Sequence, residues 1–294
     1  MNILEQIADR TRLRVAEEQR RLPLSALRRQ AEEQVSREPA PPSLEEAFRK
    51  PGLHFLCEVK KASPSKGVIA EDFPYLSIAR EYQAAGAEGI SCLTEPFWFQ
   101  GRDAYLQEIA GAVTIPVLRK DFTVDEYMIY QARVLGASAV LLICAILDDG
   151  QLSAYRQLAR ELGLDALVEV HNRQEAERAL RCGATLMGVN NRDLRTFQVD
   201  LQNTFRLREA IPPEVTLLSE SGIRTPEEIR RLRQAGVNGV LIGETLMRAA
   251  DKGAMLAQLR GGGQPGEAVS LPEASGTGHP GRAGEAIPAK GTAP

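Results

Sequence analysis

Closely spaced cysteines and histidines, the usual signature of disulfide frameworks and zinc sites, are missing from this sequence. Its four cysteines, Cys57, Cys92, Cys144 and Cys182, stand far apart, and each lies within or beside an apolar run. Only three histidines occur. We therefore expect no metal centre and no histidine-based triad, and we expect the cysteines to be buried, reduced thiols. Such cysteine usage is typical of a reducing cytoplasm, which is the predicted location.

Long apolar runs and an excess of one charge are also missing. The N-terminal stretch "MNILEQIADRTRLRVAEEQRR" has no apolar signal-peptide core, and no segment approaches the roughly 18 apolar residues of a membrane-spanning helix. The formal net charge is only -3. Neither a membrane nor a nucleic acid is therefore an expected partner. The hydrophobic fraction of 43% is still enough for a large core.

The two ends of the chain differ in composition from its middle. Residues 1–50 have helical apolar spacing, with Ile3, Leu4 and Ile7 on one face, and then the proline-rich segment "EPAPPS". We expect them to form an N-terminal helical extension packed on the main domain. Residues 261–294 are rich in Gly, Pro, Ala and Glu and nearly lack large apolar side chains, which predicts a disordered C-terminal tail.

A strand–helix pattern repeats across residues 51–260. Helix-length segments close at glycines, which supply the left-handed C-cap conformation, at positions 86, 111, 136, 163, 183 and 236. The apolar runs are "HFLCEVK", "GISCLT", "IPVLRK", "SAVLLICAI", "DALVEV", "TLMGVN", "VTLLSE" and "GVLIG". Eight such units predict an α/β fold, a (β/α)8 TIM barrel that forms the catalytic domain. An open doubly wound sheet is the alternative, but no strand is followed by G-x-G-x-x-G.

Several of these runs end in residues that can carry chemistry. They are Glu58 and Lys60 in the first strand, Lys120 in the third, Glu169 in the fifth, Asn190 and Arg192 in the sixth, and Glu220 and Ser221 in the seventh. In such barrels the active site lies at the carboxyl ends of the strands. An unpaired charge inside a barrel is costly, so we interpret the set as one pocket whose charges pair with one another or with a ligand. Unrelated surface ion pairs are the plainer interpretation of any single member.

The last two strands carry a different signal. Gly222 and Gly243 directly follow the seventh and eighth strands, ahead of the next helices. Glycine there lets backbone N–H groups approach an anion, and helix N-termini favour negative charge. This is the usual phosphate position in such barrels, so we expect a phosphorylated small-molecule substrate.

Seven segments, taken in order, carry a resemblance to a known family. "CEVKKASPSKG", "LTEPFWFQG", "VLRKDF", "LVEVH", "GVNNRDL", "SESGI" and "LIGETLM" resemble successive signature segments of the indole-3-glycerol phosphate synthase family of tryptophan biosynthesis. The resemblance spans roughly residues 1–260, and the opening "ILEQIADRTRLRVAEEQ" is similar to that family's extra N-terminal helix. It implies a lyase without a cofactor. The reaction would be ring closure, decarboxylation and dehydration of 1-(2-carboxyphenylamino)-1-deoxyribulose 5-phosphate to indole-3-glycerol phosphate.

The resemblance also implies a role for each residue of the pocket. Lys120 would be the general acid that polarises the substrate ketone. Glu58 and Glu169, assisted by Lys60, would divide the proton transfers of dehydration, and the sequence does not assign which is acid and which is base. The implied catalytic set is Glu58, Lys60, Lys120, Glu169, Asn190, Glu220 and Ser221.

Substrate-binding residues follow from the same resemblance. The implied substrate contacts are Ser63, Phe97, Arg192 and Leu194. The cluster Phe97, Trp98 and Phe99 after the second strand is either core packing under a loop or an apolar wall for the aromatic ring. The implied phosphate contacts are Lys60, Gly222, Gly243 and Glu244. A carboxylate beside a phosphate dianion would repel it, so we expect Glu244 to turn its side chain away and bind through its N–H alone.

Two other functions compete with this one. A Schiff-base aldolase would use Lys120 or Lys60 as its nucleophile, and borohydride trapping would distinguish it. A phosphate-binding barrel without catalysis would bind ligand and not turn it over. A monomer is expected, and transient contacts with other tryptophan-pathway enzymes are left open.

Overall fold

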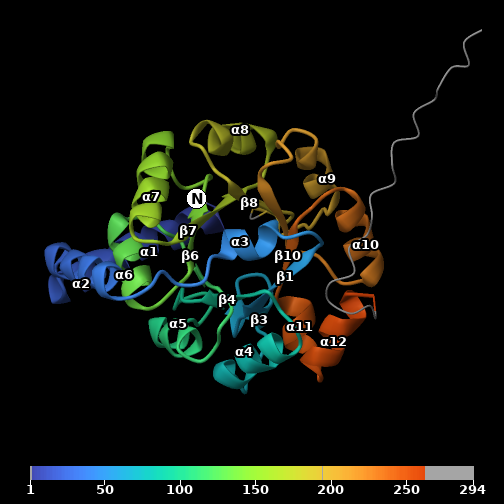
Figure 1. Cartoon of the computed structure of the whole chain (residues 1–294), viewed down its shortest axis with the longest axis horizontal. Coiled ribbons are helices and arrows are strands. Elements are labelled where there is room, and N and C mark those ends of the chain that lie inside the picture. The colour runs from blue at the N-terminus through green and yellow to red at the C-terminus, as the bar shows by residue number, and fades with distance from the viewer. Residues whose placement is uncertain (1, 194, 262–294) are drawn as a thin grey trace, which may run out of the picture.

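Eight parallel strands close into a barrel in the order β1-β10-β9-β8-β7-β6-β5-β4 (Figure 1). The structure, a computed structural model, describes residues 2–193 and 195–261. The barrel strands are β1 (His54–Val59), β4 (Gly89–Leu93), β5 (Val117–Lys120), β6 (Ala139–Ile143), β7 (Asp165–Val170), β8 (Leu186–Asn190), β9 (Thr216–Glu220) and β10 (Gly239–Ile242). The predicted (β/α)8 barrel is confirmed. A short antiparallel pair, β2 (Ala62–Ser63) and β3 (Gly67–Val68), follows β1 and was not expected.

Helices surround the barrel and precede it. The outer helices are α4 (Tyr75–Ala84), α5 (Asp103–Ala110), α6 (Glu126–Val134), α7 (Asp149–Glu161), α8 (Arg173–Arg181), α9 (Gln202–Arg208), α10 (Pro226–Gln234), α11 (Glu244–Arg248) and α12 (Lys252–Leu259). The N-terminal helices are α1 (Ile3–Arg21), α2 (Leu24–Arg37) and α3 (Leu44–Arg49). The predicted disordered tail lies, apart from Gly261, outside the described residues.

The helix boundaries show the chemistry that the sequence predicts, with one exception. Thr225 caps α10 through the N–H of Glu228, and Pro226 occupies the first helical position. Five of the six predicted glycine stops have positive φ angles. Gly111 differs: its φ is -75°, so α5 ends in right-handed geometry, and the prediction of a left-handed cap there was wrong.

Two of the N-terminal helices, α3 and α1, cover opposite ends of the barrel. Leu44 and Phe48 of α3 are fully buried, and they pack where Gly89 and Gly239 begin their strands. A side chain at Gly239 would overlap the Phe48 ring, so α3 can approach the strand ends closely. Figure 1 looks onto this end, with α3 across the middle of the ring of strands. At the other end α1 lies over the carboxyl ends of the strands.

Inside the barrel each strand places every second residue on the interior face. In four strands a buried leucine is followed two residues later by a charged residue. The pairs are Leu56 and Glu58, Leu118 and Lys120, Leu167 and Glu169, and Leu218 and Glu220. The leucines belong to one apolar cluster that fills the barrel, so the charged side chains stand on an apolar floor at its carboxyl end.

All four cysteines are buried and form no disulfide bond, as predicted. Across residues 2–193 and 195–261, no helix is long and apolar enough to cross a membrane. The same residues contain no group of three or more His, Cys, Asp or Glu side chains placed to hold a metal ion.

Candidate active site

A cavity opens at the carboxyl end of the barrel. Twelve of the predicted site residues line it: Glu58, Lys60, Ser63, Lys120, Glu169, Asn190, Arg192, Glu220, Ser221, Gly222, Gly243 and Glu244. They come from six barrel strands and the segments after them, so the fold gathers residues that are up to 186 positions apart, as from Glu58 to Glu244. Leu194 lies outside the described residues. Phe97 is not part of the lining.

Lys120 lies between two carboxylates. Its Nζ donates to Glu169 Oε2 at 2.7 Å and to Glu220 Oε2 at 3.0 Å. Asn190 Nδ2 lies 3.3 Å from the other oxygen of Glu169, Oε1. Both carboxylates are almost fully buried, at 2% and 1% exposure, so water contributes little to stabilising their charge. A single ammonium therefore stabilises two acidic side chains in a site of low dielectric.

The ionisation states of this trio follow from burial and charge. Burial alone would lower the pKa of Lys120, but Glu169 and Glu220 outweigh it and raise the pKa well above the usual lysine value. Burial would raise the pKa of Glu169, but Lys120 and then His171 outweigh it and hold the pKa below the usual range. For Glu220 burial prevails over Lys120, and the pKa rises to about 7. Near neutrality Lys120 is protonated, Glu169 is ionised and Glu220 can hold a proton.

Glu58 and Lys60 form a second pair beside Gly243. Lys60 Nζ donates to Glu58 Oε2, and both side chains face the cavity. A Cβ on Gly243 would overlap that carboxylate oxygen and lie 3.0 Å from Lys60 Nζ. Gly243 therefore does more than free a backbone N–H, because its missing side chain makes room for the pair.

The loop after β9 has an unusual backbone. Ser221 has φ of 70° and Gly222 has φ of 82°, so two consecutive residues are left-handed. For a serine this conformation costs free energy, and such strain is concentrated at functional sites. The carbonyl of Ser221 accepts a hydrogen bond from Asn191 Nδ2 at 3.2 Å, which helps to hold the turn. Both residues line the cavity.

Glu244 contacts two cations at the start of α11. Its Oε1 lies 3.5 Å from Lys66 Nζ and 3.3 Å from Arg248 Nε. Lys66 belongs to the turn between β2 and β3, so the ion pair joins that turn to the loop after β10. The carboxylate is thus paired with Lys66 and Arg248, neither of which lines the cavity.

Comparison with known proteins agrees with this geometry. A family model described as indole-3-glycerol phosphate synthase matches residues 4–259. This chain belongs to the indole-3-glycerol phosphate synthase family. Proteins of that name from Lachnoclostridium phytofermentans and Ruminiclostridium cellulolyticum are each 50% identical to it, over 88% of this chain and 98% and 99% of their own lengths.

Solved structures outside the indole-3-glycerol phosphate synthase family share the fold. A 3-hexulose-6-phosphate synthase matches with a TM-score of 0.59 at 16% identity, over 71% of this chain and 99% of its own. A thiamine phosphate pyrophosphorylase from Pyrococcus furiosus matches with a TM-score of 0.56 at 16% identity, over 74% and 96%. At these identities the likeness concerns the barrel alone.

The apolar wall of this indole-3-glycerol phosphate synthase family member differs from the predicted one. Phe97 is 46% exposed and stacks under the guanidinium of Arg10 at 4.3 Å, outside the cavity. Phe99 lines the cavity instead, beside Phe122 at 6.2 Å between ring centroids. The buried carboxylate of Glu95 accepts the backbone N–H groups of residues 97, 98 and 99, and this turn decides which ring points inward. The sequence shows three adjacent aromatics and gives no sign of that turn.

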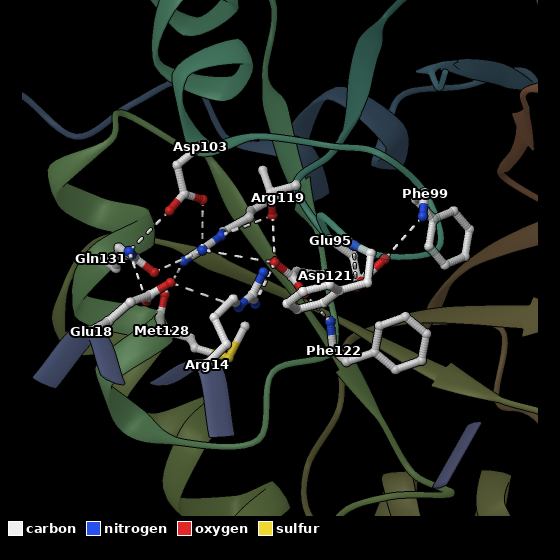
Figure 2. A network of polar contacts seen from close by, with 12 residues as sticks. Arg14, Glu18, Glu95, Phe99, Asp103, Arg119, Asp121, Phe122, Met128 and Gln131 are labelled. Atoms are coloured by element: carbon white, nitrogen blue, oxygen red, sulfur yellow. Dashed lines mark hydrogen bonds and ion pairs between the residues drawn. The ribbon is translucent and has the colours of Figure 1, made fainter. Parts of the chain in front are cut away.

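Helix α1 supplies the rest of the wall. Ile3, Leu4 and Ile7 line the cavity, which the sequence prediction of a packed extension did not include. Figure 2 shows how α1 is attached: Arg14 Nη2 donates to Asp121 Oδ2 at 2.9 Å, within a buried network around Arg119. Thr94 Oγ1 also donates to Asp121, at 2.7 Å.

Arg119 completes that network on the outer side of β5. Its guanidinium donates hydrogen bonds to the side chain of Asp103 at 2.8 Å and to that of Gln131 at 2.7 Å. It also donates to the carbonyl of Met128 at 2.9 Å (Figure 2). The Arg119 guanidinium thus faces away from Lys120, as its parity in the strand predicts, and the Asp121 carboxylate lies 3.8 Å from it in the same network. Their bonds fix the strand end that carries Lys120.

Gly188, on β8, is a site residue that the sequence reasoning missed. It lies opposite Glu169 in the sheet, and a Cβ there would overlap Glu220 Oε1 and approach its Cδ to 3.0 Å. The Glu220 carboxylate therefore occupies space that only glycine leaves free. Its Oε1 is buried without a hydrogen-bond partner. The signal in the sequence is a lone glycine inside a strand, which often marks a close approach.

Replacing Gly188 by Ala should displace Glu220 from Lys120. We expect kcat to fall about 10- to 100-fold, since displacement of a reacting group by about 1 Å can cost that much. The measurement is steady-state kinetics with a thermal melt. Gly111→Ala is the matched control, because a Cβ there meets nothing closer than 3.5 Å and its φ is negative. In a Glu220→Ala background the Gly188→Ala change should have little further effect, and an undiminished effect there would contradict this account.

Proposed function

We propose that the protein closes the ring of 1-(2-carboxyphenylamino)-1-deoxyribulose 5-phosphate, releases CO2 and water, and forms indole-3-glycerol phosphate, with Lys120 as the general acid of ring closure. The observation that carries these roles is Lys120 held protonated between Glu169 and Glu220 on the floor of the cavity. Family membership supports the reaction, and the ionisation of the trio supports the roles.

Lys120 acts on the ketone oxygen. Attack of the aromatic carbon on the ketone turns its oxygen into a hydroxyl, and this oxygen needs a proton as its charge develops. A protonated amine on an apolar floor supplies both the proton and the electrostatic stabilisation. Loss of CO2 then restores the aromaticity of the ring and needs little help. A protonated Lys120 also weakens the aldolase alternative, because an amine nucleophile needs a lowered pKa, and here the pKa is raised.

Glu169 is the proposed base for dehydration. It is ionised, so it can accept the proton from the carbon that was C1 of the ribulose. Once Lys120 has given its proton away, Glu169 loses that cation and becomes a stronger base. The Glu58–Lys60 pair is the proposed donor to the departing hydroxyl, because Lys60 carries the available proton. Glu220, whose pKa is about 7, can return a proton to Lys120.

The substrate's two anionic groups set its orientation. We place the phosphate at Lys60, Ser63 and the backbone N–H groups of Gly222, Gly243 and Glu244. The first N–H groups of a helix have no partner within the helix, which supports this end. Asn190, Arg192 and Ser221 are the proposed contacts of the anthranilate carboxylate and the ribulose hydroxyls. Phe99 and Ile7 replace Phe97 as the proposed apolar wall for the aromatic ring.

Replacing Lys60 by Ala should raise KM and lower kcat together. A charge-assisted hydrogen bond contributes about 1.5–3 kcal/mol, so KM should rise roughly 10- to 100-fold. The inhibition constant of inorganic phosphate should rise in parallel, which separates phosphate binding from proton transfer. Lys61→Ala is the control, since Lys61 does not line the cavity. An unchanged KM and phosphate affinity in Lys60→Ala would rule out this phosphate contact.

The test of the activity is direct. Purified protein is mixed with the substrate, and indole fluorescence and released CO2 are followed together. We expect equal amounts of both products without added metal or cofactor. Borohydride added during turnover should trap no adduct on Lys120 or Lys60; a stable adduct would favour the aldolase. Binding of the substrate without either product would favour a barrel that has lost catalysis.

Four further features complete the proposal. We propose that the protein works in the cytoplasm as a monomer, and that contacts with other enzymes of the pathway are transient. We also propose that residues 1–50 act as an extension of one catalytic domain, residues 51–260. Size-exclusion chromatography with light scattering tests the monomer.

A further inference from the structure

His171 directly follows β7 and places its ring between two carboxylates. Its Nε2 lies 3.3 Å from Glu169 Oε1, and its Nδ1 lies 3.1 Å from Glu175 Oε2. The side chain is 16% exposed, and it is not part of the cavity lining. His171 thus approaches Glu169 from outside the cavity lining.

Glu175 is itself held in place. It belongs to the first turn of α8, and its Oε2 accepts the backbone N–H of His171 at 2.8 Å. Its Oε1 accepts from Asn172 Nδ2 at 2.7 Å, and its own N–H donates to Asn172 Oδ1 at 3.0 Å. The ring of His171 is therefore positioned by a carboxylate that a helix N-terminus fixes.

The charges around the ring favour an imidazolium. The charged groups that face it are Glu169 from β7 and Glu175 from α8, while α9 contributes a neutral amide, Asn203, which donates to the His171 carbonyl at 3.0 Å. Burial alone would lower the pKa of His171, but the two carboxylates outweigh it and raise the pKa to about 10. These charges favour a proton on both ring nitrogens at neutral pH.

The two oxygens of Glu169 then have separate partners. Oε2 accepts from Lys120, whereas Oε1 lies near Asn190 Nδ2 and His171 Nε2. Lys120 can lose its charge during the reaction, and His171 cannot reach the substrate. Without His171 a carboxylate buried to this extent would take up a proton as soon as Lys120 released its own.

We propose that His171 is a positioning residue for the reaction: an imidazolium held by Glu175 keeps Glu169 ionised and fixes the direction of its Oε1. This inference depends on the proposed role of Glu169 as a base. Glu169 remains available to accept the carbon-bound proton after Lys120 has acted, because a second cation behind it is not consumed.

The test is the pH dependence of kcat for His171→Gln, which keeps a hydrogen-bond donor and removes the charge. Loss of an adjacent cation raises a carboxylate pKa by about 1–3 units, so the acid limb of the kcat profile should move up by that amount. Activity should be lost at acidic pH and largely recovered at alkaline pH. KM should stay within about twofold of wild type, since the residue does not line the cavity.

Two variants keep the result interpretable. His54→Gln makes the same substitution at the opposite end of the barrel and should leave the pH profile of kcat unchanged. Glu175→Gln should give an intermediate shift, because the imidazolium then has one carboxylate instead of two. A merely structural role for His171 predicts a lower melting temperature with an unmoved profile, and that outcome would overturn the proposal.

A second readout does not depend on turnover. The chain has only three histidines, so the nitrogen-15 signals of the imidazoles can be assigned with the His171→Gln and His54→Gln variants. We expect both ring nitrogens of His171 to be protonated at pH 7.5 in the full-length protein. A neutral ring at that pH would overturn the inference even if the protein makes indole-3-glycerol phosphate. A charged ring in a protein without that activity would instead contradict the proposed function.

Discussion

Lys120→Met should lower kcat by about 100-fold or more, with only a modest rise in KM. That is the usual scale for a general acid that acts on a reacting oxygen. Methionine is close to lysine in length and apolar, so it can occupy the same channel on the leucine floor. The change removes the donor that Glu169 and Glu220 share. Stopped-flow and steady-state assays of indole fluorescence measure the effect.

The stability of this variant is part of the prediction. With the ammonium gone, the two buried carboxylates keep no cation between them, and we expect Glu220 to take up a proton, since its pKa is already about 7. The protein should therefore still fold, with a melting temperature that falls more at alkaline than at neutral pH. Lys61→Met is the control at a lysine outside the cavity lining. A near wild-type kcat for Lys120→Met would remove Lys120 from the mechanism.

Glu169→Gln should separate two products that the wild-type protein makes together. If Glu169 is the base of dehydration, ring closure and decarboxylation still proceed in the variant, and the carbon-bound proton is then not removed. We expect a burst of CO2 close to one equivalent per site, followed by indole formation slowed by about 10²–10⁴-fold. Rapid-quench measurement of CO2 beside indole fluorescence resolves the two events.

Glu58→Gln is the comparison for this experiment. It alters the other carboxylate of the cavity and leaves Lys120 and its partners in place. Since Glu58 and Lys60 are assigned to the departing hydroxyl of the same dehydration, Glu58→Gln should also release CO2 ahead of indole, and the burst alone does not separate the two roles. A substrate with deuterium at C1 of the ribulose adds a check, because the slow step in Glu169→Gln should then show a primary isotope effect. A C1-deuterium isotope effect in Glu58→Gln but not in Glu169→Gln would mean that the roles are exchanged. Equal slowing of CO2 and indole would place Glu169 in ring closure instead.

Much of this site could be predicted because every second residue of a barrel strand faces the interior, so the spacing of residues along the strand gives the side on which each side chain lies. Leu118 and Lys120 are two residues apart and therefore lie on the same face of their strand. In a strand that is buried on both sides, we expect this face to be the barrel interior. Helix boundaries were predictable for a similar local reason. Thr225 and Pro226 act within one turn of chain, so their effect is visible without the rest of the fold.

The features that escaped prediction depend on contacts between distant segments. Gly188 matters through Glu220, which lies on the next strand. The inward ring is Phe99 because Glu95 caps the turn, and periodicity does not apply in a loop. Ile7 reaches the cavity because Arg14 ties α1 to Asp121, 107 residues away. The role of His171 depends on Glu169 and Glu175 together, and one histidine after a strand does not show that pairing.

The central claim is that one cavity holds the reacting centre over Lys120 and the phosphate at the turns after β9 and β10. A crystal structure of the protein with indole-3-glycerol phosphate tests it most directly. We expect the indole ring beside Phe99 and Lys120, and the phosphate within hydrogen-bond distance of Lys60 and the backbone N–H groups of Gly222 and Gly243. A phosphate bound elsewhere, or an indole far from Lys120, would contradict it.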